Sequence, residues 1–264
     1  MMNINSIATR LWELDESKIA KCNSAHKICL NCKICHIKTG EIKFHIPSNG
    51  KNIAKFIDHT LLNSDAKAAD IIKICHEARK YNFASVCLNP YYVKLAKKEM
   101  NQKTVCSVVG FPLGANSVHI KIEECKKALK DGATEIDMVQ NIGELKVGGY
   151  NFVLTEIETI AEICHENDSI LKVIIETCLL SKEEKIIACL IAKKAGADFV
   201  KTSTGFSQSG ATTEDVKLMK SVVGDFVGVK ASGGIRDFQK AQDMISAGAN
   251  RIGASSSLKI IGEK

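Results

Sequence analysis

The amino-acid sequence lacks the features that would assign the chain to a membrane, an export route or a nucleic acid. It contains no run of 18 apolar residues, so it predicts no transmembrane helix and no membrane partner. Residues 1–20 carry charges throughout and have no apolar stretch of the signal-peptide type, which favours a cytoplasmic location. A basic patch with interleaved aromatic residues is also missing, so nucleic acid is not an expected partner.

The charge of the chain is unevenly distributed. Residues 1–52 contain eight Lys and Arg against four Asp and Glu, whereas residues 53–264 contain 28 against 26. The second balance is too even for a surface that binds nucleic acid. The chain has 264 residues, of which 45% are hydrophobic and 25% charged. These values fit one large globular domain, or one domain with an appendage.

The eleven cysteines are odd in number, and seven of them are scattered among apolar residues, as Cys75 and Cys189 are. Cysteine in such positions behaves as a small core residue. Because no export signal is present, we expect these thiols to be reduced.

Residues 1–52 form a distinct N-terminal extension with a cysteine cluster. Ile7, Leu11 and Leu14 fall at helical spacing and predict a short amphipathic helix. Residues 22–36 then hold four cysteines and two histidines, which is a composition that invites a metal.

No standard metal motif fits this cluster. The segment from Cys32 to His36 matches a haem attachment pattern, but haem attachment normally requires export. Three cysteines match the first ligands of an iron–sulfur run, but Thr39 occupies the fourth position. The spacing also fits no standard pair of zinc knuckles. We therefore favour a loosely structured extension and expect no metal.

From Ile53 to Lys264 the sequence alternates between strand and helix patterns. Two predicted helical faces consist of Ala68, Ile71, Ile72 and Cys75, and of Val153, Ile157, Ile160, Ala161 and Cys164. Between the helices we expect eight strands: Ala54–Asp58, Ser85–Leu88, Thr104–Val109, Thr134–Val139, Leu171–Glu176, Asp198–Lys201, Phe226–Lys230 and Asn250–Gly253.

Several helices end in an Ala-Gly-Ala or Asp-Gly-Ala signal, at Gly132, Gly196 and Gly248. A glycine at this point stops a helix in a left-handed cap. The repeated helix–glycine–strand unit predicts an α/β protein with a (β/α)8 TIM barrel and a short N-terminal extension. The alternative is an open doubly wound sheet, although no Gly-x-Gly-x-x-Gly motif follows the first strand.

Two predicted strands end in lysine, at Lys201 and Lys230. Catalytic residues of such barrels lie at the C-terminal ends of the strands. Burying an ammonium without a partner is unfavourable, so a lysine at a buried strand end points to a specific role. A neighbouring cation favours the neutral, nucleophilic form of a lysine. Asp137 is expected to face the same cavity, so these three residues are the catalytic candidates.

Other polar residues near strand ends have more than one possible role. For Cys87 we favour a small core residue near the barrel mouth. Asp58 and Glu176 are either residues that line the site or structural partners of charged groups. Glu135 and Lys172 lie one layer below on neighbouring strands and are expected to form a buried pair.

Two small-residue loops after the last strands, together with Gly205 in the loop after Lys201, are candidates for binding a phosphate. They contain Gly233 and Gly234, and Ser255 and Ser256. Each of the two precedes a predicted helix, whose free N–H groups favour an anion. In either loop alone the small residues could simply serve a tight turn.

Several segments resemble the deoxyribose-phosphate aldolase family. They are Ile57–Leu62, Glu135–Val139, Lys172–Thr177, Lys201–Phe206, Gly228–Arg236 and Arg251–Ser256. The resemblance extends in order from about Ile53 to Ser256. It does not cover the cysteine-rich extension.

The resemblance implies a class I aldolase that reversibly cleaves 2-deoxy-D-ribose 5-phosphate to D-glyceraldehyde 3-phosphate and acetaldehyde. Lys201 matches the Schiff-base lysine, Lys230 the second lysine that keeps the first partly neutral, and Asp137 the acid/base. No metal or other cofactor is implied, and the expected assembly is a homo-oligomer, by family habit a dimer. Many relatives carry a C-terminal tail with a tyrosine, whereas the last tyrosine here is Tyr150. We expect the role of that tyrosine to be lost or supplied by another group or water.

Two other classes of function are weaker alternatives. A metal-dependent phosphate-sugar enzyme would need His or Cys ligands at several strand ends, and only His59 and Cys87 lie near. A binding protein built on an inactive barrel would not need Lys201, Lys230 and Asp137 together. Mass spectrometry after borohydride reduction with substrate distinguishes a Schiff-base enzyme from both.

Overall fold

The computed structural model describes Ile7 and residues 53–263. Ile7 is helical and buried. The remaining residues of the predicted N-terminal helix and the cysteine–histidine cluster lie outside the described residues.

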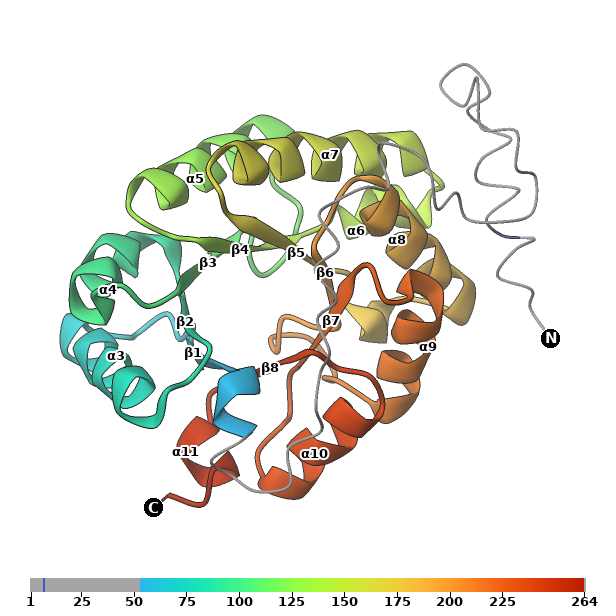
Figure 1. Ribbon diagram of the computed structural model, residues 1–264. Coiled ribbons are helices and arrows are strands. Elements are labelled where there is room, and N and C mark those ends of the chain that lie inside the picture. The colour runs from blue at the N-terminus through green and yellow to red at the C-terminus, as the bar shows by residue number, and fades with distance from the viewer. Residues whose placement is uncertain (1–6, 8–52, 264) are drawn as a thin grey trace.

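Eight parallel strands form a closed barrel in sequence order, as the sequence predicts (Figure 1). Each strand pairs with the next, and β8 closes the ring against β1. The strands are β1 (Ile57–Leu61), β2 (Ser85–Leu88), β3 (Val105–Val109), β4 (Glu135–Val139), β5 (Ile170–Ile174), β6 (Phe199–Lys201), β7 (Gly228–Ser232) and β8 (Arg251–Ala254).

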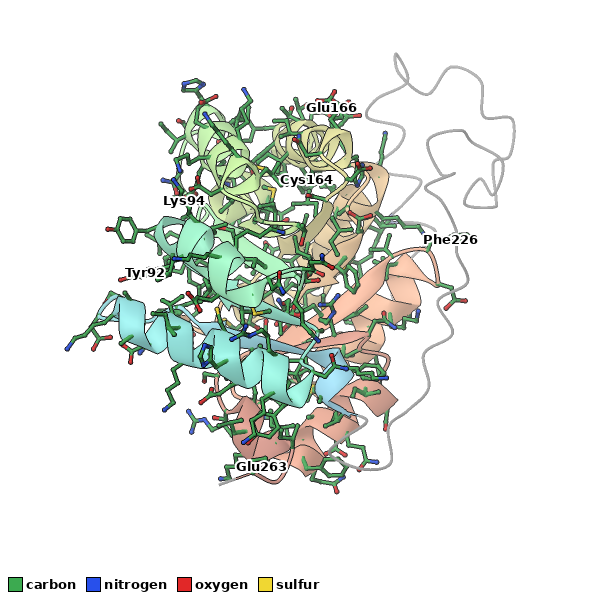
Figure 2. The ribbon with its side chains drawn as sticks, turned by 60° about the vertical axis from the view of Figure 1, so that its left-hand side comes forward. Tyr92, Lys94, Cys164, Glu166, Phe226 and Glu263 are labelled. Carbon is green, nitrogen blue, oxygen red and sulfur yellow. The ribbon has the colours of Figure 1, made fainter. Side chains whose placement is uncertain are left out.

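Helices surround the barrel in Figure 1, and α3 and α4 lie side by side on its outside in Figure 2. The helices are α3 (Ala68–Tyr81), α4 (Val93–Met100), α5 (Val118–Lys130), α6 (Ile142–Lys146), α7 (Tyr150–Glu166), α8 (Lys182–Lys194), α9 (Thr213–Val223), α10 (Phe238–Ser246) and α11 (Ser257–Ile260). Three short 3₁₀ turns accompany them: η1 (Ala54–Phe56), η2 (Pro90–Tyr92) and η3 (Thr177–Leu179). Among the described residues, no helix is both long and apolar enough to span a bilayer.

The apolar residues separate into a large outer core and a small inner cluster. Outward-facing strand residues such as Ile136 and Val200 pack with the helices. The inner cluster holds Leu62, Cys87, Cys106 and Val108, with Phe111 packed against it. Because both faces of these strands are buried, the strands appear in the sequence as nearly continuous apolar runs.

The predicted glycine caps are confirmed. Gly132, Gly196 and Gly248 all have positive φ, at 106°, 86° and 114°. After each glycine, the next residue donates its N–H to a carbonyl five positions back, as Ala133 does to Ala128 at 3.0 Å. This is the hydrogen bond that closes a Schellman motif, and it turns each helix directly into the next strand.

Several predicted boundaries are wrong. The first strand was expected at Ala54–Asp58, but residues 54–56 form η1, and β1 runs from Ile57 to Leu61. The seventh strand begins at Gly228 rather than Phe226, whose side chain is half exposed. Asp58 and Lys230 therefore lie inside their strands and not at the last position.

Two further corrections concern a helix face and a strand end. On α3 the buried face consists of Ile71, Ile74, Cys75 and Ala78, whereas Ala68 and Ile72 are exposed. The predicted fifth strand included Glu176, but β5 ends at Ile174, and Glu176 has a left-handed backbone with φ of 55°. The buried face predicted for α7 is confirmed.

Candidate active site

Three lysines converge on the carboxylate of Asp137 inside the barrel. Lys201 Nζ lies 2.7 Å and Lys230 Nζ 2.6 Å from the same oxygen, Oδ2. Lys172 Nζ lies 2.8 Å from the other oxygen, Oδ1. All four side chains are buried. The strand positions chosen from the sequence thus come together at one carboxylate, and Lys172 joins them.

A second layer of charge surrounds this cluster. Lys230 Nζ also contacts Asp58 Oδ2 at 2.6 Å, and Lys172 Nζ contacts Glu135 Oε2 at 2.6 Å. The predicted pair of Glu135 and Lys172 is therefore present. Arg251 on β8 links Asp58 and Glu135, contacting Glu135 Oε1 at 3.1 Å. Together with Lys201, the network is continuous across six of the eight strands: β1, β4, β5, β6, β7 and β8.

The charged neighbours decide the protonation of this buried network. Burial raises the pKa of Asp137, but Lys172, Lys201 and Lys230 outweigh it and hold that pKa well below its usual range. Burial lowers the pKa of Lys230, but the carboxylates of Asp137 and Asp58 reverse the shift and raise it. The pKa of Lys172 is raised in the same way, chiefly by Asp137 against the effect of burial.

Counting the charges of the network identifies a surplus cation. Its basic side chains are Lys172, Lys201, Lys230 and Arg251, and its acidic side chains are Asp58, Glu135 and Asp137, which makes four against three. Lys172 and Lys230 each contact two carboxylates, whereas Lys201 contacts one. An uncompensated buried charge is unfavourable. Lys201 is therefore the basic group that the network least requires to be charged.

Two thiols border the same carboxylate. Cys106 Sγ lies 3.1 Å from Asp137 Oδ1, and Cys87 Sγ lies 3.9 Å from Oδ2. Burial raises the pKa of Cys106, while a hydrogen bond with Cys106 lowers the pKa of Cys87. Cys87 belongs to the inner apolar cluster, as expected of a small core residue near the mouth.

Among the described residues, Cys87, Cys106 and Asp137 also form a group whose potential metal-ligand atoms lie within 4.8 Å of one another. Both oxygens of Asp137 are already bound by lysine ammonium groups. A metal cation would have to compete with those charges at close range, which disfavours a metal here. A metal-free site remains our prediction.

Glu176 does not contact the lysines but fixes the loop after Lys201. Its carboxylate accepts hydrogen bonds from the N–H of Thr204, at 3.2 Å to Oε2, and from the Thr204 hydroxyl. A non-glycine residue with positive φ is strained, and such strain persists only where the surroundings enforce it. Glu176 is thus placed as a support of the loop that contains Gly205.

The small-residue loops follow β6, β7 and β8, and the first two of them lie close together. A Cβ built on Gly205 would be 3.9 Å from Gly233 Cα, and one on Gly233 would be 2.8 Å from Gly210 Cα. Gly205, Gly234 and Ser255 are exposed, and Gly233 and Ser256 are partly exposed. The loops after β6 and β7 therefore approach each other backbone to backbone, and all five residues remain at least partly accessible to a ligand.

Sequence reasoning missed several members of the site. Lys172 was expected to pair with Glu135 alone, and Arg251 and Cys106 were not singled out. Two signals could have identified Cys106 and Lys172. Both lie at inward positions of the two-residue period of β3 and β5, and Cys106 is the register partner of Glu135 as Lys172 is of Asp137. Nothing local marks Arg251, because its partners are on β1 and β4.

In this closed (β/α)8 barrel, lysines and a carboxylate are buried together in the interior. This is the arrangement of a barrel enzyme with amine chemistry. The sequence of the DeoC/LacD family of aldolases matches this chain over residues 52–262. The chain belongs to that family and is a carbon–carbon lyase, as the resemblance in the sequence predicts.

Individual relatives agree with this assignment. A deoxyribose-phosphate aldolase of Thermococcus gammatolerans is 57% identical over 216 residues, covering 80% of this chain and 96% of that protein. One of Caldanaerobacter subterraneus is 59% identical over 215 residues, covering 80% and 93%. Among solved structures, the tetrameric deoxyribose phosphate aldolase of Aeropyrum pernix has a TM-score of 0.77 at 32% identity, covering 82% of this chain and 92% of that one.

Proposed function

We propose that this chain reversibly cleaves 2-deoxy-D-ribose 5-phosphate to D-glyceraldehyde 3-phosphate and acetaldehyde through a Schiff base on Lys201. Relatives that are 55–59% identical over about four fifths of the chain are named deoxyribose-phosphate aldolases, which supports the substrate. The observation that carries the mechanism is the contact of Lys201 Nζ with Asp137 Oδ2 at 2.7 Å, inside a network with one cation in excess.

The reaction follows from a neutral amine beside a carboxylate. The Lys201 amine adds to the C1 carbonyl of the open-chain sugar, and loss of water from the carbinolamine leaves an iminium. The electron pair of the C2–C3 bond then moves into the iminium, the C3 hydroxyl loses its proton, and the triose phosphate leaves. The remaining enamine takes a proton on C2, and water releases acetaldehyde from Lys201.

Asp137 is suited to the proton transfers of these steps. Its carboxylate touches Lys201 and is held in place by Lys172 and Lys230, so its position is fixed on both oxygens. A general acid or base must lie within hydrogen-bond reach of the group that exchanges the proton. Asp137 therefore accepts the proton that leaves the attacking amine. It then donates that proton to the carbinolamine hydroxyl, which departs as water.

Borohydride trapping tests the mechanism. Reduction of the protein during turnover of deoxyribose 5-phosphate should convert the acetaldehyde iminium to an N-ethyl group on Lys201, identified by peptide mass spectrometry. Reduction without substrate is the control and should leave Lys201 unmodified. Labelling of Lys230 in place of Lys201 would show that Lys230 is the nucleophile and that the assignment to Lys201 is wrong.

The phosphate of the substrate is proposed to bind at Gly205, Gly233, Gly234, Ser255 and Ser256. Gly205 and Gly233 approach each other, and all five residues are at least partly exposed, so their backbone N–H groups and the hydroxyls of Ser255 and Ser256 are candidate donors to a phosphate. The loops lie after β6, β7 and β8, where barrels of this class usually bind a substrate phosphate.

Replacing Gly234 with aspartate should mainly raise KM for the phosphorylated sugar. The added carboxylate repels the dianion, and a change of this kind near a phosphate is expected to cost about tenfold or more in affinity. Gly234→Ala is the matched control, because it also places a Cβ at a φ of 71° but adds no charge. An equal KM for the two variants would place the phosphate elsewhere.

The chain is also proposed to form a homo-oligomer, and we expect a dimer. The structural neighbour from Aeropyrum pernix is described as a tetramer, which supports association but leaves the number of subunits to be measured. Light scattering after gel filtration should give twice the mass of the 28.8 kDa chain.

A further inference from the structure

A buried chain of hydrogen bonds connects α3 to the loop after β8. His59 Nε2 lies 2.7 Å from Glu77 Oε2, and His59 Nδ1 lies 2.9 Å from Ser257 Oγ. Ser257 Oγ also lies 2.9 Å from the carbonyl oxygen of Ala254, within hydrogen-bond distance. Ser257 is fully buried and His59 is 5% exposed. None of these three side chains belongs to the lysine network described above.

The inner end of this chain is attached to the proposed phosphate loop. Ala254 is the last residue of β8, and Ser255 and Ser256 lie between it and Ser257. His59 on β1 is the register partner of Ala254. The Ser257 hydroxyl therefore bridges both ends of the short segment that carries the two proposed phosphate ligands.

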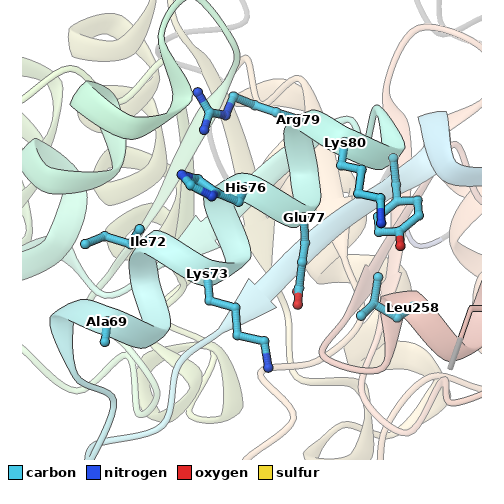
Figure 3. Close-up of a pocket in the computed structure, with 9 residues that line it drawn as sticks. Ala69, Ile72, Lys73, His76, Glu77, Arg79, Lys80 and Leu258 are labelled. Carbon is cyan, nitrogen blue, oxygen red and sulfur yellow. The ribbon is translucent and has the colours of Figure 1, made fainter.

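The outer end of the chain is fixed on a helix at the surface. Glu77 lies on α3 and lines an open pocket together with Lys73, Lys80 and Leu258 (Figure 3). In this view the Glu77 side chain extends from α3 on the side where Leu258 of α11 lies. Its carboxylate can only accept a hydrogen bond, so the His59 Nε2–H donates to it, which fixes the orientation of the ring.

The orientation of the His59 ring determines which hydrogen-bonding group faces the Ser257 hydroxyl. With Nε2 donating to Glu77, Nδ1 of a neutral His59 is left as an acceptor that faces the Ser257 hydroxyl. Burial lowers the pKa of His59, against the opposing effect of Glu77, which favours this neutral form. Ser257 Oγ then lies 2.9 Å from two acceptors, Nδ1 and the Ala254 carbonyl, and its single proton is donated to one of them at a time.

We propose that Glu77, His59 and Ser257 act as positioning residues that hold the Ala254–Ser256 segment in the conformation that binds the substrate phosphate. The inference rests on the phosphate site proposed above. It assigns a role in binding the phosphate end of the substrate, and none in the chemistry at Lys201.

The test compares 2-deoxyribose 5-phosphate with unphosphorylated 2-deoxyribose. In Ser257→Ala, kcat/KM for the phosphorylated sugar should fall about tenfold through KM, as expected from losing one positioning hydrogen bond, while kcat/KM for the unphosphorylated sugar changes less than about twofold. A merely structural defect would lower both by the same factor, and that outcome would overturn the proposal.

Two substitutions at position 59 separate the two ends of the chain. His59→Asn places an amide near the Nδ1 position and retains a partner for Ser257, whereas His59→Gln places one near Nε2 and retains only the Glu77 contact. We expect His59→Gln to resemble Ser257→Ala and His59→Asn to lie closer to the unmodified protein. The reverse order contradicts the proposal, and this comparison stands even where Ser257→Ala does not fold.

The chain offers matched controls outside this segment. Ser169 is also a buried serine that donates to a nearby carbonyl, that of Asn167 at 3.1 Å, and His165 also contacts a carboxylate, that of Asp198 at 3.0 Å. Ser169→Ala and His165→Gln should leave the ratio of the two substrates unchanged. A change of similar size in these variants would overturn the specific role of Ser257 and His59.

Gly234→Asp separates failure of this inference from failure of the phosphate site itself. If Gly234→Asp lowers the preference for the phosphorylated sugar while Ser257→Ala does not, only the positioning role is overturned. If neither variant alters the preference, the proposed phosphate site is wrong and the positioning role falls with it.

Discussion

Replacing Lys201 with alanine is expected to remove turnover and covalent trapping together. The substitution deletes the proposed nucleophile, a loss that reaches roughly four orders of magnitude or more in other covalent enzymes. Folding should survive, because Asp137 keeps Lys230 on Oδ2 at 2.6 Å and Lys172 on Oδ1 at 2.8 Å. Steady-state cleavage, borohydride labelling and thermal melting on one preparation measure these three expectations.

Lys185 provides a matched control for this experiment. It forms an ion pair with Asp215 at 2.6 Å, between α8 and α9 in the helical ring. Lys185→Ala should therefore keep turnover and still label at Lys201. The assignment of Lys201 fails if Lys201→Ala is labelled at Lys230 at the normal rate. It fails equally if chelators abolish activity while trapping of the unmodified protein yields nothing.

The strand pattern of the sequence is sufficient to predict that Asp137, Lys201 and Lys230 lie together inside the barrel. Inward and outward positions alternate along a strand, so the inward face is identified even where a boundary is misplaced. Lys230 illustrates this point: β7 begins at Gly228 and not at Phe226, yet Lys230 still faces Asp137. The glycine signals predict the repeating unit for an equally local reason.

The depth of each side chain in the barrel is not a local property. Closing eight strands requires a stagger between neighbours, and that stagger sets which residues share a layer. Asp58 is only the second residue of β1, yet it reaches Lys230 on β7 and Arg251 on β8. The same stagger allows Lys172 to reach both Glu135 and Asp137. No single strand of the sequence contains this information.

The geometry of the loops could not be predicted from the sequence either. Glu176 continues the apolar run of β5 in the sequence, but its left-handed backbone ends the strand and directs its carboxylate to Thr204. Ser257 appears in the sequence as one more small residue after Ser256, and only the contact with His59, 198 residues away, distinguishes it. Both features depend on elements that meet only in the closed barrel.

Replacing Lys230 with methionine is expected to lower turnover by orders of magnitude without removing the nucleophile. The network then contains Lys172, Lys201 and Arg251 against three carboxylates, so a charged Lys201 is needed for balance. Less Lys201 is present as free amine at neutral pH, and the rate falls. Raising the pH removes the proton from Lys201 and should restore part of the rate, which a pH–rate profile measures. Trapping should still label Lys201, but slowly.

A second substitution tests whether charge balance is the cause. Adding Asp58→Asn to Lys230→Met leaves Lys172 and Arg251 against Glu135 and Asp137, so the network is again balanced with Lys201 neutral. Because Lys230 contacts Asp58 directly at 2.6 Å, the two changes are expected to be strongly non-additive. The double variant should be about tenfold or more faster than Lys230→Met alone at neutral pH. If the double variant is as slow as Lys230→Met, and its pH–rate profile is unchanged, Lys230 acts through a proton transfer or through the position of Asp137 and not through the charge of the network.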